Sequence, residues 1–445
     1  MIKQEDLPLM VDLYELAMAQ AYWAEGMADT AVFSLFFREL PENRNFVLAC
    51  GQRHIAELIG QLRFTEDHID RLRQLNRFQP EFLDWLRGFR FSGSIRAVEE
   101  GMPLFPQEPI LEVTAPIAEA QLLESLIMNY VHLESVLASK SVRLTFAADG
   151  KPVVDFGMRR MHGLDSAHRG VRAYRLAGLA GTSNVLAGLD YGLDVSGTMA
   201  HSFVQAYPDE MEAFKVYARL YPGTTLLVDT YDTRRAVRRI VDWLRQEPDV
   251  RIGGIRIDSG DLEQESRDCR KILDDAGFRG IKIMASGGLD EYRIAALLQA
   301  GAPIDGFGVG TAIGAANDAP ALELAYKLTE YAGEPKMKNS SGKTSWPGPK
   351  QVFRQFDGSG LARGDVIAGI GEQVDGSPLL ETVMTNGALL PGFPAPLDDL
   401  VSRASDAVAA LPRPFKALQP AEAFPVEFTE YLQNLQAETL RQVAV

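Results

Sequence analysis

The pattern of apolar and polar positions predicts a mixed first domain. Before residue 117 it predicts helices over residues 7–23, 51–62, 65–75 and 80–86, and strands over residues 30–38, 91–99 and 109–114. Helices and strands interspersed in this way are typical of an α/β unit. The sequence therefore predicts an N-terminal α/β domain over residues 1–116.

The pattern changes in the middle of the chain. From residue 117 to residue 146 apolar positions recur every three or four residues, which predicts a long helix and a domain boundary. Short apolar runs then alternate with helical stretches, and they predict strands over residues 152–156, 195–199, 225–228, 253–257, 281–285 and 304–309. Continuous apolar strands between helices are typical of a parallel sheet. Six such units predict an irregular TIM-like α/β barrel, either complete or partial, over residues 117–330.

The last part of the chain, residues 331–445, loses this alternation. It begins as a basic loop, for which the simpler interpretation is solvated lysines and the alternative is ligand contact. Residues 367–412 are predicted to form additional strands that return to the N-terminal domain, and residues 421–442 a closing helix. The lysines of the loop are Lys336, Lys338, Lys343 and Lys350.

Composition narrows the class of protein. The 445 residues suit two domains, and 46% apolar with 24% charged residues is ordinary for a globular protein. The net charge of -15 argues against general nucleic-acid binding. No apolar run reaches the roughly 20 residues of a membrane span, and the acidic N-terminus differs from a signal peptide, so a cytoplasmic location is expected. Cys50 and Cys269 lie too far apart in sequence for a zinc knuckle or a disulfide framework.

Polar residues follow every strand of the predicted barrel. In a barrel the carboxyl ends of the strands converge on one mouth, so residues scattered over the sequence become neighbours. Polar groups at every strand end therefore predict a binding site. In chain order they are Asp155 with Arg159 and Arg160, Thr198 with His201, Asp229 to Asp232, Arg256 with Asp258, Ser286 to Gly288, and Gly308 to Thr311.

The stretch from Gly253 to Leu262 carries the strongest local signal. Alternation along a strand places Arg256 and Asp258 on the same face, and a helix opened by Asp261 follows. A guanidinium and a carboxylate in this position suit a ligand with carboxylate, phosphate and sugar hydroxyl groups. The alternative is a structural ion pair that caps the strand.

Small residues follow the last two predicted strands. Without a bulky side chain, the main-chain N–H groups near Gly287, Gly288, Gly310 and Thr311 can approach an anion closely. A helix beginning just beyond Thr311 would add its positive end. Barrels commonly bind phosphate at this position, so the sequence predicts a phosphate site here.

Several motifs, taken together, resemble one enzyme family. They span residues 12–354, and they occur in the order Asp12-Leu13-Tyr14, Phe156-Gly157-Met158-Arg159-Arg160, Gly197-Thr198-Met199-Ala200-His201-Ser202-Phe203, Asp229-Thr230-Tyr231-Asp232, Ile257-Asp258-Ser259-Gly260-Asp261-Leu262 and Gly308-Val309-Gly310-Thr311. The chain resembles the nicotinate phosphoribosyltransferases. The resemblance implies transfer of phosphoribosyl from phosphoribosyl pyrophosphate to nicotinate in NAD salvage, with Mg²⁺, and with ATP as co-substrate as in the ligase class. It also implies a homodimer with shared active sites.

The resemblance implies roles for individual residues. Nicotinate would be held by Tyr14, Arg159, Thr198 and Arg256, although Tyr14 could equally be a core aromatic with its hydroxyl at the surface. His201 would carry a phosphoryl group from ATP.

The remaining roles concern the phosphoribosyl group. Asp229 and Asp258 would address ribose hydroxyls or metal, and no dedicated protein cage for a metal is expected. Gly287, Gly288, Gly310 and Thr311 would cradle the 5′-phosphate.

Three other functions remain as alternatives. Nicotinamide phosphoribosyltransferases place an acidic residue after the Gly-Thr pair that resembles Gly181-Thr182, where this chain has Ser183-Asn184, so Ser183 favours nicotinate. Quinolinate phosphoribosyltransferases are shorter and need no ATP-linked histidine. A non-catalytic phosphate-binding barrel would bind phosphoribosyl pyrophosphate without turnover.

Overall fold

The computed structural model describes residues 4–340 and 345–443, which form two compact units. The first unit comprises Met1–Ser139 and Ala321–Val445, and the second comprises Lys140–Pro320. These boundaries differ from those expected at residues 117 and 331. The reason is that one continuous helix, α6 (Glu124–Ala147), runs through the first boundary, so a change of hydrophobic pattern at residue 117 does not mark a change of unit. Lys343 of the basic loop lies outside the described residues.

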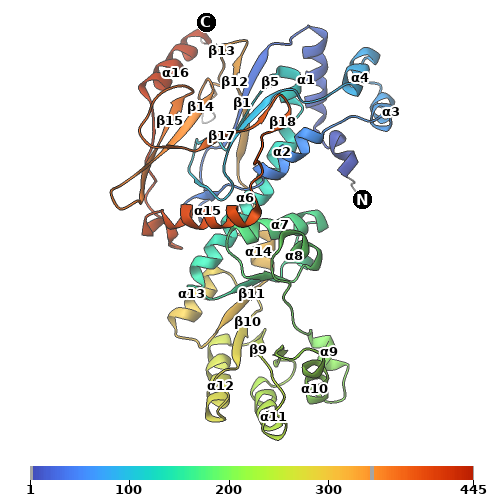
Figure 1. The fold of residues 1–445 in the computed structure, drawn as a ribbon, viewed down its shortest axis with the longest axis vertical. Helices are drawn as coiled ribbons and strands as arrows, with labels where there is room; N and C mark the ends of the chain where they lie inside the picture. Colours follow the sequence, from blue (N-terminus) through green and yellow to red (C-terminus); the bar gives the residue numbers. More distant parts are fainter. Residues whose placement is uncertain (1–3, 341–344, 444–445) are drawn as a thin grey trace. The chain divides into compact units, whose positions relative to one another are not determined.

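A seven-stranded sheet forms the main layer of the first unit (Figure 1). Its strand β1 pairs antiparallel with β5 on one side and with β12 on the other, so segments from both ends of the sequence build one sheet. Its strands in order are β13 (Glu334–Pro335), β12 (Leu324–Tyr331), β1 (Thr30–Phe37), β5 (Leu111–Pro116), β3 (Ser94–Val98), β17 (Leu380–Thr385) and β18 (Ala388–Leu389).

Two smaller sheets and several helices complete the first unit. The sheets consist of β16 (Ser377–Pro378), β14 (Lys350–Phe356), β15 (Ala362–Gly369) and β19 (Val426–Phe428), and of β2 (Val47–Leu48) with β4 (Pro103–Leu104). The helices are η1 (Gln4–Leu9), α1 (Leu13–Ala24), α2 (Gln52–Gln61), α3 (Glu66–Gln74), α4 (Pro80–Arg87), α5 (Ile117–Gln121), α15 (Leu397–Ala409), η3 (Arg413–Lys416) and α16 (Glu430–Val443).

Three expectations for this unit were wrong in detail. The single helix over residues 7–23 is two helices, because Pro8 lies in the 3-10 turn η1 and α1 begins only at Leu13. Residues 397–409, expected within a run of strands, form helix α15. The closing helix begins at Glu430, since Val426–Phe428 pairs parallel with β15 as strand β19.

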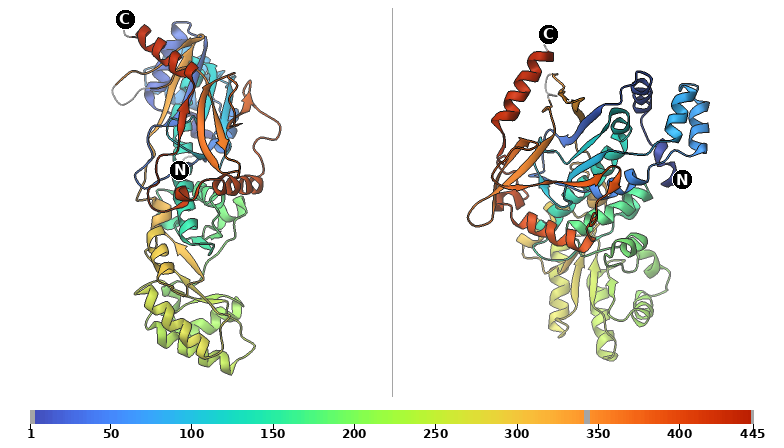
Figure 2. Two further views of the ribbon diagram at one scale, coloured as in Figure 1. Left: turned by 90° about the vertical axis from the view of Figure 1, so that its left-hand side faces the viewer. Right: turned by 45° about the horizontal axis from the view of Figure 1, so that its top comes forward.

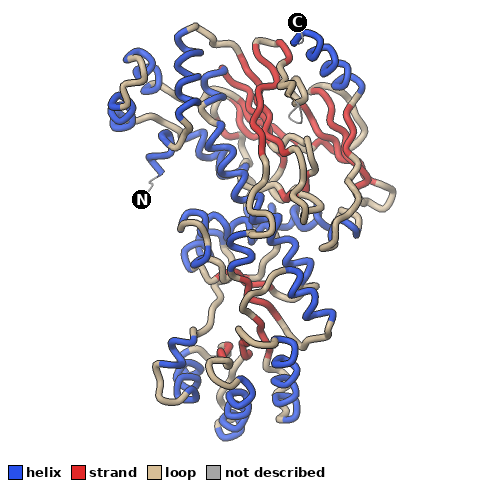
Figure 3. Tube along the Cα trace, turned by 180° about the vertical axis from the view of Figure 1, so that it is seen from behind, coloured by secondary structure: helices blue, strands red, loops and turns tan. Residues whose placement is uncertain are grey.

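The second unit contains an open, curled sheet of six parallel strands (Figure 3). Their order is β7 (Gly181–Thr182), β6 (Val153–Asp155), β11 (Gly306–Val309), β10 (Lys282–Ala285), β9 (Gly254–Ile257) and β8 (Thr225–Leu227). The sheet is therefore a partial barrel, and the complete TIM-like barrel is not confirmed. Residues 195–199, expected to be a strand, make only one bridge, between Val195 and Thr182, so β7 and β8 stay edge strands.

Helices connect these strands, and four of the described ones begin with an aspartate cap, one of which is Asp209 before Glu210–Leu220. The Asp232, Asp261 and Asp290 side chains accept a hydrogen bond from the main-chain N–H three residues later, which stabilises the first turns of α11, α12 and α13. Helices α11 and α12 lie side by side (Figure 2). The helices of this unit are η2 (Met158–Arg160), α7 (Leu164–Leu176), α8 (Val185–Tyr191), α9 (His201–Gln205), α10 (Glu210–Leu220), α11 (Thr233–Gln246), α12 (Leu262–Asp275), α13 (Glu291–Gln299) and α14 (Thr311–Ala315).

Across both units, no described helix combines the length and the apolar composition that crossing a membrane would require.

Candidate active site

The carboxyl ends of the parallel strands in the second unit bring together most of the residues singled out from the sequence. Because β6, β11, β10, β9 and β8 are neighbours and run in the same direction, the segments that follow them lie along one edge of the sheet. Hydrogen bonds then connect neighbouring strand ends to one another. The sheet thus assembles a polar site without closing into a barrel.

Asp229 links the ends of β8 and β9. Its Oδ2 atom accepts hydrogen bonds from the main-chain N–H of Asp258 at 3.0 Å and from the Ser259 hydroxyl at 2.6 Å. Its Oδ1 atom is buried and has no hydrogen-bond partner. A buried carboxylate oxygen without a partner is costly, so this atom is a candidate for binding a ligand group.

Arg256 on β9 is the second group with unused hydrogen-bonding capacity. Its Nη2 atom donates to the Met199 carbonyl at 3.1 Å, and its guanidinium lies 5.6 Å from the centre of the Phe156 ring. Its Nε atom is buried without a partner. Burial lowers the pKa of Arg256, while Asp258 and Asp229 act in the opposite direction. The arrangement provides a positive charge and a free N–H beside a flat apolar surface.

His201 lies between the ends of two strands. Its Nδ1 atom is 3.1 Å from the Thr230 hydroxyl, and its Nε2 atom is 4.0 Å from an Asp258 carboxylate oxygen. His201 opens the short helix α9 and is partly exposed. Thr198, three residues earlier, donates its hydroxyl to the Met199 carbonyl at 3.2 Å, which is also the carbonyl that binds Arg256.

The loop after β10 is held closely against Asp258. The Ser286 hydroxyl donates a hydrogen bond to the Asp258 carboxylate. Gly287 has a φ of +86°, and a Cβ atom there would lie 1.7 Å from the Asp258 carbonyl oxygen. Arg293 donates to the carbonyls of Gly287 and Gly288 at 3.5 and 3.4 Å. Only glycine fits at position 287, because both the conformation and the close main-chain contact exclude a side chain.

The loop after β11 packs against the loop after β6. A Cβ atom at Gly308 would lie 2.4 Å from the Phe156 ring, and one at Gly310 would lie 3.4 Å from the Phe156 carbonyl oxygen. Thr311 is exposed and is the first residue of α14, so this helix begins at Thr311 instead of beyond it.

Two further sequence-predicted residues are Arg159, in the second unit, and Tyr14, in the first. Arg159, in η2, is exposed but near enough to Arg256 to lower its pKa further. Tyr14 belongs to the first unit, where it is 46% exposed on α1. There, burial and the nearby Glu124 and Glu15 raise the pKa of its hydroxyl.

The sequence analysis named Asp155 at a strand end and Ser183 as favouring nicotinate, but it did not foresee that a row of hydrogen bonds joins them. Buried Asp155 accepts hydrogen bonds from the Gly157 N–H at 2.6 Å and from the Thr182 hydroxyl at 2.7 Å. It thereby joins the end of β6 to β7, next to Ser183, whose N–H donates to the Asp155 carbonyl at 2.8 Å. The one available signal was a carboxylate at the end of an apolar strand, since the two-residue strand β7 is too short to recognise by periodicity.

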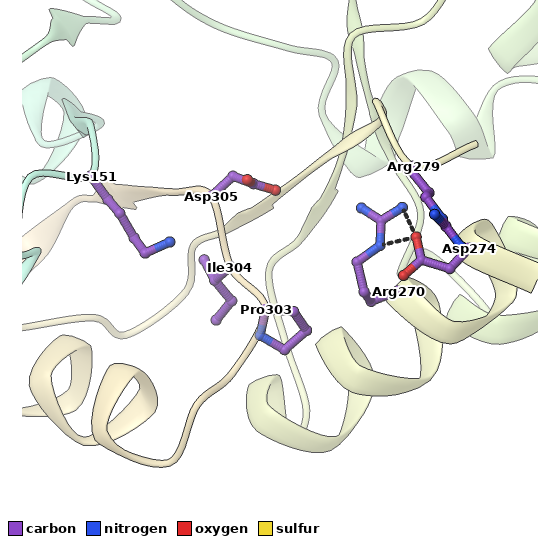
Figure 4. A pocket seen from close by; sticks show the side chains of 7 residues that line it. All are labelled: Lys151, Arg270, Asp274, Arg279, Pro303, Ile304 and Asp305. Carbon is purple, nitrogen blue, oxygen red and sulfur yellow. Dashed lines mark hydrogen bonds and ion pairs between the residues drawn. The ribbon is translucent and has the colours of Figure 1, made fainter. Parts of the chain in front are cut away.

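A different arrangement occupies the amino ends of the same strands. A pocket of about 300 Å³ there is lined by charged side chains that largely bind one another or main-chain atoms (Figure 4). Arg270 binds Asp274 and the carbonyls of Ile281 and Phe278, and Asp305 binds Lys282 and the Ile283 N–H. The lining residues are Lys151, Arg270, Asp274, Arg279, Pro303, Ile304 and Asp305.

The described lysines of the basic loop differ in their surroundings. Lys350 is buried in β14, where its ammonium group binds the carbonyls of Trp346 and Gly348. Burial lowers its pKa. Lys336 and Lys338 are exposed.

Cys50, Glu100 and Glu134 bring possible metal-ligand atoms within 4.8 Å of one another. However, Glu100 caps the Gly51 and Arg53 N–H groups, and Glu134 binds His54 and the Cys50 thiol.

Comparison with known proteins places this chain in a family. Residues 9–132 match the family model described as the nicotinate phosphoribosyltransferase (NAPRTase) N-terminal domain, and residues 152–346 match the model of the nicotinate phosphoribosyltransferase (NAPRTase) family. This chain belongs to the nicotinate phosphoribosyltransferase family. The resemblance inferred from the motifs is therefore confirmed.

Individual members of the nicotinate phosphoribosyltransferase family are similar over nearly their full length. Nicotinate phosphoribosyltransferase pncB2 of Mycobacterium tuberculosis is 50% identical, over 94% of this chain and 90% of its own. The Bacillus subtilis nicotinate phosphoribosyltransferase is 35% identical, over 99% and 96%. The crystal structure of human nicotinic acid phosphoribosyltransferase superposes with a TM-score of 0.85 at 27% identity, covering 96% of this chain and 99% of that one.

Proposed function

We propose that this protein is a nicotinate phosphoribosyltransferase that forms nicotinate mononucleotide and pyrophosphate from nicotinate and phosphoribosyl pyrophosphate, in NAD salvage. In this reaction the ring nitrogen of nicotinate forms a bond to the anomeric carbon of the ribose, and the bond to the pyrophosphate oxygen breaks. The observation that carries the proposal is the pair of buried unpartnered atoms, Arg256 Nε and Asp229 Oδ1, in one cluster of strand ends.

Arg256 is the group best suited to hold the nicotinate carboxylate. Its free Nε–H and its positive charge match an anionic group, and the neighbouring Phe156 ring supplies an apolar surface for a pyridine ring. Arg159 adds a second positive charge, and Thr198 shares a carbonyl partner with Arg256. Ser183 brings no negative charge to this region, which favours nicotinate over nicotinamide.

The glycine loops and the two aspartates suit the phosphoribosyl group. Gly287, Gly288, Gly310 and Thr311 are partly or fully exposed, and the three glycines carry no side chain that would block a phosphate, which supports their proposed role at the 5′-phosphate. The Asp258 carboxylate and the free oxygen of Asp229 are hard oxygen donors, which fit ribose hydroxyls or Mg²⁺. When bound with pyrophosphate, Mg²⁺ neutralises the charge that develops on the leaving group. The protein side chains then position the two reactants in line.

His201 is the residue proposed to make the reaction depend on ATP. A neutral imidazole nitrogen attacks the terminal phosphorus of ATP, ADP leaves, and water later releases phosphate from the histidine. The hydrogen-bonding distance to Thr230 and the nearby Asp258 carboxylate support this role, since they orient the imidazole ring.

A homodimer with shared active sites is part of the same proposal. Tyr14 is exposed in the first unit, so a second copy of the chain could supply it to the strand ends. Helix α8, which begins two residues after Ser183, leaves Val185, Leu186 and Leu189 between 60% and 72% exposed. Apolar side chains this accessible are typical of a surface that another chain covers.

The decisive experiment compares three bases in parallel. Purified protein with Mg²⁺ and phosphoribosyl pyrophosphate is given nicotinate, nicotinamide or quinolinate, each with and without ATP, and the mononucleotide product is measured. Nicotinate mononucleotide that forms selectively and faster with ATP supports the proposal. Selective turnover of nicotinamide would assign the protein to the other substrate, and binding without turnover of any base would favour a regulatory role.

The ATP step has a separate test. We expect His201→Ala to lose ATP hydrolysis and ATP stimulation while it keeps slow, ATP-independent transfer, because nicotinate and the 5′-phosphate are assigned to other residues. The matched control is His168→Ala, since His168 is a partly exposed histidine of the same unit whose partners are Asp190 and Tyr191. ATP stimulation that persists in His201→Ala would contradict the phosphohistidine role.

A further inference from the structure

A buried lysine connects the two glycine loops of the second unit. The Lys140 ammonium on α6 contacts the carboxylate of Glu291, and it lies 2.8 Å from a carboxylate oxygen of Asp318. The side chains of Lys140 and Glu291 are 1% and 0% exposed, and that of Asp318 is 16% exposed. Arg143, one turn further along α6, donates to the other Glu291 oxygen at 3.0 Å.

Each of the two acids lies in the segment that follows one of the glycine loops. Glu291 is the first residue of α13, directly after the loop that contains Gly287 and Gly288. Asp318 follows the short helix α14, which Thr311 opens. A single ammonium group thus binds the segments that follow both proposed phosphate loops, although the loops are separated by more than 20 residues in sequence.

The cost of burying these charges calls for an explanation beyond stability. Removing charged groups from water is unfavourable, and well-packed apolar side chains of similar volume are often at least as stabilising as a buried ion pair. A charged cluster has a different property, which is that it holds its members in one specific geometry. Two loops that bind one phosphate together need their main-chain N–H groups to be held at a fixed direction and spacing.

We propose that Lys140 is a positioning residue for phosphoribosyl pyrophosphate, because it fixes the spacing between the two glycine loops. This inference rests on the proposed function. Lys140 itself does not touch the substrate. Its loss would let each loop move separately, so that the main-chain N–H groups of the two loops would no longer converge on one phosphate.

The test compares Lys140→Met, Asp318→Asn and the double variant with the wild-type enzyme. Lys140→Met should raise KM for phosphoribosyl pyrophosphate about 10-fold and change KM for nicotinate less than about 2-fold, because misplacement affects only the phosphate loops. Asp318→Asn, which keeps the lysine, should raise the same KM about 3-fold. The double variant should be no worse than Lys140→Met alone, since both changes break the same link.

The matched control is Lys151→Met, which removes a lysine of the same unit at the amino ends of the strands. It should leave both KM values unchanged. Equal increases of the two KM values in Lys140→Met, or additive effects in the double variant, would overturn the inference and indicate general destabilisation.

Folding and function are checked independently. The melting temperature of each variant is measured with and without phosphoribosyl pyrophosphate, so a variant that does not fold is recognised by the loss of its cooperative transition. If Lys140→Met does not fold, the inference is tested by Asp318→Asn, which is the milder change at a partly exposed site. A rise in KM for phosphoribosyl pyrophosphate without a similar rise in KM for nicotinate supports the inference, and equal rises overturn it. A wild-type protein that shows neither turnover nor a melting shift with phosphoribosyl pyrophosphate would refute the proposed function instead.

Discussion

The two ends of the parallel sheet in the second unit are built from similar charged residues. They differ in whether the polar atoms of these side chains have hydrogen-bond partners. At the amino ends, the Arg270 guanidinium binds a carboxylate and two carbonyls, and both Asp305 oxygens have donors. At the carboxyl ends, Arg256 keeps a buried N–H and Asp229 a buried oxygen without any partner. Charge alone does not distinguish the two ends.

This difference teaches how a binding site can be recognised in a charged surface. Buried polar groups in folded proteins are nearly always paired, so those left unpaired at one end and not at the other mark where an additional molecule completes the structure. A pocket by itself is a weaker guide, because the charged groups around the amino-end pocket largely satisfy one another (Figure 4). Substitutions at matched positions of the two ends should therefore affect different properties.

The largest contrast is expected between two glycines. Gly287→Ala places a Cβ atom within 1.7 Å of the Asp258 carbonyl oxygen, so the loop must move and turnover should fall by about 1000-fold. Gly280→Ala, at the amino end, meets no atom within 4 Å and should leave turnover unchanged. Steady-state kinetics measure both. Similar activity of the two variants would contradict the assignment of the Gly287 loop to phosphoribosyl pyrophosphate.

The next contrast concerns arginine. Arg256→Ala should lower kcat/KM for nicotinate by about 100-fold, because the carboxylate loses a charged donor in a partly buried site. ATP hydrolysis should change far less. Arg279→Ala, an exposed arginine of the amino-end pocket, should leave both unchanged. An equal loss of nicotinate and ATP activity in Arg256→Ala would show that this arginine does not recognise the carboxylate.

A smaller and more informative contrast concerns two aspartates. Asp229→Asn keeps an oxygen for the Asp258 and Ser259 donors but removes the charge, so activity should fall about 10-fold with little change in melting temperature. Asp305→Asn loses its ion pair with Lys282 and should cost less than about 1 kcal/mol of stability without affecting activity. Activity assays and thermal melts of both variants provide the comparison. If Asp229→Asn destabilised the protein as its main effect, Asp229 would be structural.

The smallest expected effect is a pH dependence at the carboxyl end. Burial raises the pKa of Asp155 above its ordinary value of 3.8, so the folded protein binds this proton more tightly than the unfolded chain. The carboxyl group therefore adds stability as the pH falls through its raised pKa towards 3.8, and this contribution is lost as the pH rises. Asp155→Asn cannot titrate.

The difference in free energy of unfolding between wild type and Asp155→Asn should shift in favour of the wild type as the pH falls towards 3.8. Urea denaturation at several pH values measures this difference. A difference that is independent of pH would contradict the raised pKa.

Much of the fold was predictable because its elements obey local rules. The strand at Thr30–Phe37 and the helices after Asp232 and Asp261 follow from apolar periodicity and from N-capping, which act within a few residues. The errors arose where distant chain decides the outcome. Val195 forms only a bridge because its partner strand β7 is two residues long, and Val426–Phe428 is a strand because β15 pairs with it.

The sequence by itself determined the family and the residue types of the candidate site, because the order of the motifs and the polar residues after apolar strands are properties of the chain. Only the tertiary structure decided that the sheet is open, that Asp229 and Arg256 have buried atoms without partners, and that Lys140 binds the segments after both glycine loops. The physical reason is that burial and hydrogen-bond partners depend on residues far away in sequence. Local pattern can name a polar residue at a strand end, but packing alone determines whether its hydrogen bonds are already made.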